Sequence, residues 1–123
     1  MRFIGFALLL LIATACGGGG DERTATELVK EGRTLYESSC AACHGMDLKG
    51  SDGGPSFLDP IYAPNHHPDE AFRSAAKNGV RQHHWNFGDM PAQPRFTDAD
   101  IDAIIAYVRS EQREAGIKND PSH

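Results

Sequence analysis

The sequence predicts a small all-α protein with three main helices, and three observations lead to that fold class. Apolar residues recur at helical spacing near the start and near the end of the predicted domain. Between these segments glycine and proline are too frequent for long regular elements. No substantial stretch alternates apolar and polar residues as a half-buried strand does. The 123 residues suffice for one domain, and the formal charge of −5 argues against nucleic acid as a partner.

The first fifteen residues predict a signal peptide. Residues 3–13 are continuously apolar but too few to span a bilayer as a helix, and Ala13-Thr14-Ala15 has the small side chains of a cleavage site. Removal of residues 1–15 would leave Cys16 as the new N-terminus, followed by four glycines.

This arrangement around Cys16 resembles bacterial lipoproteins, in which such a cysteine is lipidated before the signal is cut. The resemblance implies a membrane attachment through an N-terminal lipid. The alternative is ordinary cleavage and a secreted protein with a free thiol at Cys16, which would be exposed to oxidation. Residues 16–25 then form a flexible linker between the lipid and the domain.

We expect the folded domain to cover residues 26–115 and to begin with a helix from Thr26 to Ser38. Its apolar positions recur at helical spacing; they are Leu28, Val29, Leu35 and Tyr36. Gly32 lies in the middle, where glycine costs about 1 kcal/mol relative to alanine. We therefore expect a second helix to cross closely at Gly32. Residues 116–123 are interpreted as a C-terminal tail.

The sequence Cys40-Ala41-Ala42-Cys43-His44 predicts a covalently attached haem c, one per chain. Each thiol of Cys40 and Cys43 can add to one haem vinyl group, and His44 can then bind the iron as an axial ligand. Two alternative interpretations of this motif are a redox-active cysteine pair and a structural zinc site. A thioredoxin-like redox pair needs a βαβ context, and a structural zinc site needs two further ligands at suitable spacing; the sequence around the motif offers neither.

Glycine and proline predict an irregular loop from Gly45 to Pro64. A second helix is expected to open at residues 67–70, with Pro68 in the first helical position and two acids at the positive end of the helix dipole. Asn78-Gly79 is a typical helix C-terminus.

The final helix has the strongest local signals. Thr97 is an expected N-cap, Asp100 completes a capping box, and Phe96 can pack on Ile101 as a hydrophobic staple. The apolar residues that follow fit the helical template and are interpreted as core; they are Ile101, Ile104, Ile105 and Val108.

The iron needs a sixth ligand, and the candidates are Met46, Met90, His66, His67, His83 and His84. Met46 is too close to His44 in the chain to reach the opposite face of a haem. Met90 lies in a Gly-Asp-Met-Pro turn between the second and third helices, where an apolar loop residue usually has a function. We favour Met90, with His83 or His84 as the alternative.

These segments together resemble the class I monohaem cytochromes c of bacteria. The resemblance rests on residues 32–45 (GRTLYESSCAACHG), 53–57 (GGPSF), 77–80 (KNGV), 88–92 (GDMPA) and 96–110 (FTDADIDAIIAYVRS). It implies a fold of three main helices and loops wrapped around one covalently bound haem. It further implies that Gly32 and Tyr36 pack near Tyr107, and that the Pro55 carbonyl accepts a hydrogen bond from His44. The run from His83 to Phe87 departs from the pattern.

The resemblance implies a function in electron transfer, without enzymatic activity, between a respiratory donor and acceptor. The expected location is extracytoplasmic in a bacterium, either lipid-anchored to the cell membrane or periplasmic. Two other hypotheses remain open at this point. One is a haem enzyme or gas sensor in which Met90 leaves the iron, and the other is a domain of a larger respiratory complex.

Overall fold

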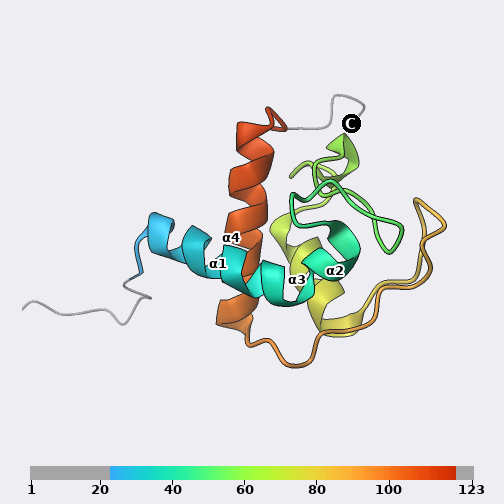
Figure 1. The fold of residues 1–123 in the computed structure, drawn as a ribbon, viewed down its shortest axis with the longest axis horizontal. Helices are drawn as coiled ribbons and strands as arrows, with labels where there is room; N and C mark the ends of the chain where they lie inside the picture. The colour runs from blue at the N-terminus through green and yellow to red at the C-terminus, as the bar shows by residue number, and fades with distance from the viewer. Residues whose placement is uncertain (1–22, 119–123) are drawn as a thin grey trace, which may run out of the picture.

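The structure, a computed structural model, describes residues 23–118, whose ordered elements are helices (Figure 1). They are α1 (Ala25–Ser39), α2 (Ala41–His44), the 3-10 helix η1 (Pro60–Tyr62), α3 (Asp69–Asn78) and α4 (Asp98–Glu114). Strand pairing within this part of the chain is limited to isolated bridges, which confirms the all-α class. Within residues 23–118, none of the helices combines the length and hydropathy that crossing a bilayer requires. The predicted signal peptide and Cys16 lie outside the described residues.

Helix α1 begins one residue earlier and ends one residue later than the sequence predicted. Thr24 is its N-cap: the side-chain oxygen of Thr24 accepts a hydrogen bond from the backbone N–H of Glu27 at 3.2 Å. The Glu27 carboxylate in turn accepts one from the Thr24 N–H at 2.9 Å. This capping box satisfies two backbone donors that no helical carbonyl can reach, and it explains the earlier start.

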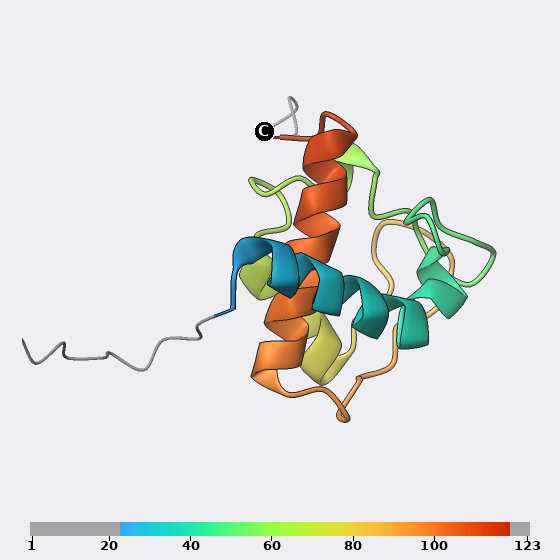
Figure 2. The same cartoon turned by 60° about the vertical axis from the view of Figure 1, so that its left-hand side comes forward.

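Helices α1 and α4 cross in contact with each other (Figure 2), and the crossing lies at Gly32. A Cβ atom at Gly32 would lie 1.8 Å from the carbonyl oxygen of Ala103, so only glycine permits this approach. Beside the crossing, the rings of Tyr36 and Tyr107 meet edge to face at 5.5 Å, and the Tyr36 hydroxyl donates to the Gly45 carbonyl at 2.7 Å. Both expectations for this crossing are confirmed.

Helix α3 begins at Asp69, with Pro68 as the N-cap. The expectation that Pro68 would be the first helical residue was wrong by one position: its ψ of 166° is extended. The helix ends at Asn78 as predicted, and Gly79 then turns the chain with a φ of +75°, which glycine adopts without strain.

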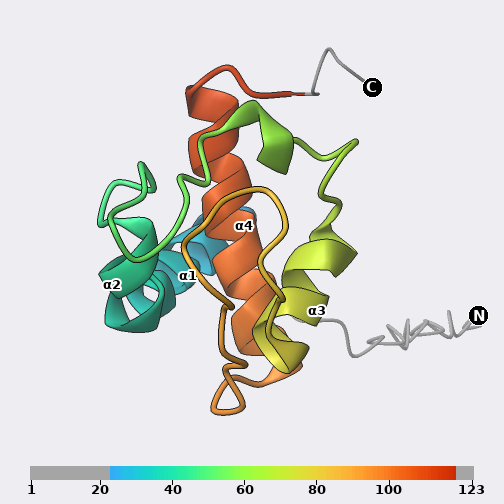
Figure 3. The same ribbon diagram turned by 90° about the vertical axis from the view of Figure 1, so that its right-hand side faces the viewer.

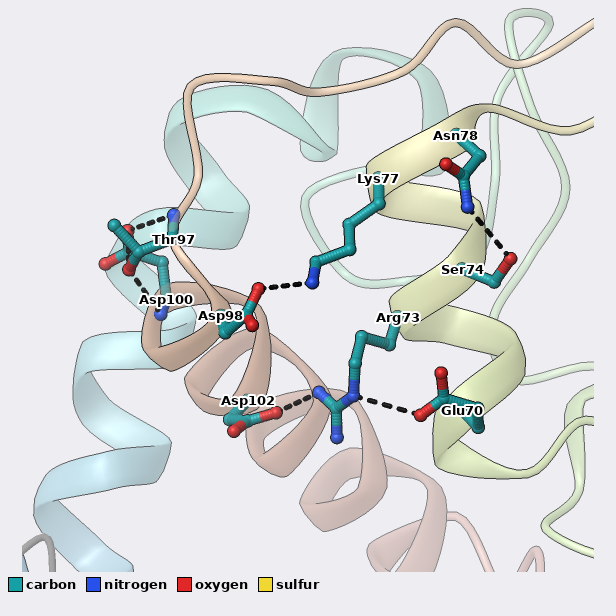
Figure 4. A network of polar contacts seen from close by, with 9 residues as sticks. All are labelled: Glu70, Arg73, Ser74, Lys77, Asn78, Thr97, Asp98, Asp100 and Asp102. Carbon is teal, nitrogen blue, oxygen red and sulfur yellow. Dashed lines mark hydrogen bonds and ion pairs between the residues drawn. The ribbon is translucent and has the colours of Figure 1, made fainter.

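The predicted capping box of α4 is confirmed. The Asp100 N–H donates to the Thr97 hydroxyl at 3.2 Å, and the Asp100 carboxylate accepts from the Thr97 N–H at 2.8 Å (Figure 4). Figure 4 also shows how α3 is held against α4 by ion pairs of Arg73 with Asp102 and of Lys77 with Asp98. These pairs are largely exposed and orient the helices more than they stabilise them.

The segment from Gly45 to Pro64 is less irregular than predicted, because η1 interrupts it. The Asp59 carboxylate accepts a hydrogen bond from the Ile61 N–H at 2.9 Å and so caps this turn, with Pro60 in its first position. A single 3-10 turn of three residues is too short to leave a periodic pattern in the sequence, which is why the glycine and proline density concealed it.

Candidate functional site

The Cys40–His44 motif forms the turn that continues α1 into α2. The Cys40 N–H donates to the Tyr36 carbonyl at 2.8 Å, and the short helix α2 then carries Cys43 and His44. Because the two cysteines are three residues apart in a helical turn, they lie on the same side of it, and both line one cavity. Burial raises the pKa of the Cys40 thiol to about 11, so a free thiol there stays protonated at neutral pH.

The imidazole of His44 is buried and held in one orientation. Its Nδ1–H donates to the Pro55 carbonyl at 2.9 Å, which leaves Nε2 as the nitrogen with a lone pair for a metal. The ring of Phe57 stacks on the imidazole with centroids 4.1 Å apart. Burial lowers the pKa of His44, although the hydrogen bond to Pro55 opposes that shift. The side chain is therefore presented as a neutral imidazole, the form that binds metals.

A cavity of about 570 Å³ opens beside this motif. Its walls come from α2, α3, α4 and the loop between α3 and α4, which arches in front of α4 in Figure 3. The apolar stripe of α4, interpreted from the sequence as core, also forms part of this wall through Ile101, Ile104, Ile105 and Val108. A cavity of this kind accepts a large apolar group better than water.

Met90 also lines this cavity, from the loop that follows α3. An antiparallel bridge holds it: the N–H groups of Val80 and Met90 each donate to the other residue's carbonyl at 2.9 Å. Gly79 makes that approach possible, because a Cβ at this position would lie 2.6 Å from the Met90 carbonyl oxygen. By contrast, Met46 is 61% exposed and is not among the lining residues.

The structure thus brings five of the six sequence-predicted site residues to one cavity: Cys40, Cys43, His44, Pro55 and Met90. The sixth, Cys16, lies outside the described residues. The unusual run from His83 to Phe87 forms part of the same wall, where Trp85 stacks on Tyr62 with centroids 5.7 Å apart.

Sequence reasoning missed two buried polar residues of α4 that hold the loops around the cavity. The Arg109 guanidinium donates to the Asp69 carboxylate and to the carbonyls of Tyr62 and His67. Gln112 donates to the carbonyls of Phe57 and Tyr62 at 2.8 and 3.3 Å. Two polar residues on the buried face of an otherwise apolar stripe were the available signal, because buried polar groups are almost always hydrogen-bonded.

These residues fit a covalently bound haem. Two thiols lie at the edge of an apolar cavity, an oriented imidazole and a thioether both reach its lining, and the neighbouring walls are aliphatic and aromatic. Imidazole and thioether are both known axial ligands of haem iron. The donor set therefore matches the cofactor that the Cys40–His44 motif predicted.

Comparisons with known proteins agree with this chemistry. Residues 29–112 match the model of the family described as cytochrome c. The chain is 31% identical over 122 residues to the cytochrome bc1 complex cytochrome c subunit of Mycobacterium tuberculosis, an alignment that covers 89% of this chain and 41% of that subunit. It is 34% identical over 117 residues to cytochrome c-551 of Bacillus subtilis, covering 89% of this chain and 92% of the relative. A cbb3-type cytochrome c oxidase subunit of Cereibacter sphaeroides is 37% identical over 84 residues, 66% of this chain and 27% of the subunit.

Proposed function

Since the chain belongs to the cytochrome c family and transfers electrons through covalently bound haem c, we propose that it is a membrane-tethered single-electron carrier. It would work on the outer face of a bacterial membrane and exchange electrons with respiratory complexes. It would have no enzymatic activity of its own.

One observation supports the carrier function most directly: the two thiols, the imidazole and the thioether that could hold a haem line the same cavity. In our proposal Cys40 and Cys43 would form the thioethers, and the side chains of His44 and Met90 would bind the iron. When bound, haem supplies an iron ion that alternates between the ferrous and ferric states. With both of these side chains bound, the iron would offer no free position to a substrate or gas.

The chain's own residues prepare the site for rapid electron exchange. Pro55 fixes the orientation of the His44 ring, and the bridge to Val80 fixes the backbone of Met90. The chain thus holds both side chains in place, so a change in the charge of a bound iron would require little rearrangement. A methionine thioether also raises the reduction potential relative to a second histidine.

The relatives suggest the class of redox partner. Two of them are subunits of a cytochrome bc1 complex and of a cbb3-type cytochrome c oxidase. The chain spans less than half of the length of these subunits, whereas it aligns with 92% of cytochrome c-551. We propose complexes of these two kinds as its electron donor and acceptor.

The proposed tether rests on the N-terminal sequence. Residues 1–15 have the composition of a signal peptide, and Cys16 followed by glycines suits lipidation. A diacylglyceryl group together with an N-terminal acyl chain exceeds the two signals that stable membrane attachment requires. Changing Cys16 to serine should therefore move the protein from the membrane fraction to the soluble fraction. Native protein found wholly in the aqueous phase of a detergent partition would instead favour secretion with a free thiol.

The carrier function is tested by changing Met90 to alanine and Met46 to alanine in parallel. The unmodified reduced protein should bind carbon monoxide poorly, because the sixth position is filled. Met90→Ala should bind it strongly and have a lower reduction potential, while the exposed Met46 can be removed without effect. Strong binding by the unmodified protein would indicate a sensor or peroxidase. An unchanged spectrum in Met90→Ala would indicate that His83 or His84 is the native ligand.

A further inference from the structure

We propose that His66, His67 and His84 form a binding site for a divalent transition-metal ion, distinct from the haem ligands. Each of the three imidazoles offers one nitrogen, and the three nitrogens lie within 4.8 Å of one another. The ring centroids are 4.8 Å apart for His66 and His67 and 5.4–5.5 Å apart for the two pairs with His84. Such a cluster is the usual donor set of a three-histidine metal site.

The spacing needs only a small adjustment to accept an ion. Two nitrogens bound to a tetrahedral zinc ion, each at 2.0–2.1 Å, lie about 3.4 Å apart. His84 is exposed, so its side chain can rotate toward the other two. His66 and His67 are half-buried, which limits the freedom that they lose on binding.

His67 is oriented as a metal ligand is. Its Nδ1–H donates to the Ile61 carbonyl at 2.6 Å, which leaves Nε2 as the coordinating nitrogen. Its backbone is held as well, because its N–H donates to the Ala63 carbonyl at 2.8 Å and its carbonyl accepts from Arg109. His67 is therefore prepared for binding.

The three ligands come from two loops that are far apart in the sequence. His66 and His67 lie between η1 and α3, and His84 lies in the loop that leads to Met90. Stacking of Trp85 on Tyr62 already brings the second loop to the first. A bound ion would join the two loops across the wall of the haem cavity, which His67 and His84 both line.

The donor set selects the class of metal. Imidazole nitrogen suits zinc, copper and nickel, and the general order of affinities places Cu²⁺ highest. Magnesium and calcium prefer oxygen ligands and should not compete. Three protein ligands also leave a fourth position for water.

The test uses tag-free haem-loaded protein, with His123, which lies outside the described residues, changed to glutamine throughout. Binding of Zn²⁺ and of Cu²⁺ is measured by titration calorimetry, with Mg²⁺ as a negative control, and the nitrogen ligands of Cu²⁺ are counted by electron paramagnetic resonance. His66→Gln and His84→Gln each remove one proposed ligand. His83→Gln is the matched control, because its ring lies only 4.2 Å from that of His84 but it is not one of the three.

We expect one ion per chain, three nitrogen ligands on Cu²⁺, and affinity at least tenfold weaker in His66→Gln and in His84→Gln. His83→Gln should differ from the parent by less than about threefold. An unchanged haem absorption spectrum and helical signal show that each variant is folded, and the exposed His84 provides a valid test even if His66→Gln misfolds. Equal affinity in the parent and in His84→Gln, or an equal loss in His83→Gln, would overturn the three-histidine site.

Discussion

Replacing Gly32 by alanine should destabilise the protein even though alanine is the better helix former. The new methyl group would lie 1.8 Å from the carbonyl oxygen and 2.4 Å from the carbonyl carbon of Ala103. Both are backbone atoms, so α1 and α4 would have to separate by roughly 1.5 Å to restore a normal carbon–oxygen distance. Such overpacking costs about 1–3 kcal/mol, and weakening the nearby Tyr36–Tyr107 contact adds about 1 kcal/mol. The higher helix propensity of alanine offsets about 1 kcal/mol of this cost, so the free energy of unfolding should fall by about 2 kcal/mol.

The assay is guanidinium denaturation of the haem-loaded protein, followed by helical circular dichroism and by haem absorbance. Thr34→Ala is the matched control, because Thr34 lies two residues away on the exposed side of α1 and gains helix preference without a clash. The control should be as stable as the parent or slightly more stable. If Gly32→Ala unfolds within 0.5 kcal/mol of the parent or is more stable, the close crossing is not what requires glycine.

Three other predictions follow from charge and hydrogen bonding. Arg109→Met should lower the free energy of unfolding by about 2–3 kcal/mol, because the His67 carbonyl and the Asp69 carboxylate lose this donor; thermal unfolding measures this, and an unchanged midpoint would contradict it. Hydrogen bonds from Thr97 lower the pKa of Asp100. The stability that the charged Asp100 carboxylate gives to the fold is therefore complete above about pH 4, and it is lost as the pH falls through the folded pKa. Asp100→Asn should therefore be less stable than the parent near pH 7, and the difference should shrink toward pH 2; a difference independent of pH would refute the capping role. Electron transfer to a basic redox partner should slow as salt rises, because the formal charge of −5 is screened; a rate independent of salt would indicate an apolar contact.

Features that depend on residues close together in the chain could be predicted from the sequence alone. The covalent attachment motif is a matter of spacing within five residues, and the capping box of Thr97 and Asp100 spans four. Both ends of α1 and the start of α4 followed from helical periodicity and capping to within one residue. Even the close crossing at Gly32 was expected, because a glycine inside a helix is costly without a packing reason.

Which distant residues meet could be seen only in the folded chain. His66 and His67 meet His84 across two loops. Arg109 and Gln112 bind carboxylate and carbonyl groups that lie some forty to fifty-five residues away in the chain. Backbone carbonyls are present at every position, so no residue pattern shows which of them a buried side chain will bind. Likewise, the apolar stripe of α4 has the same spacing whether it packs on a helix or lines a cavity. Whether this face of α4 packs on a helix or lines a cavity depends on where the rest of the chain lies beside it. That arrangement is fixed only when the loops fold around the helix.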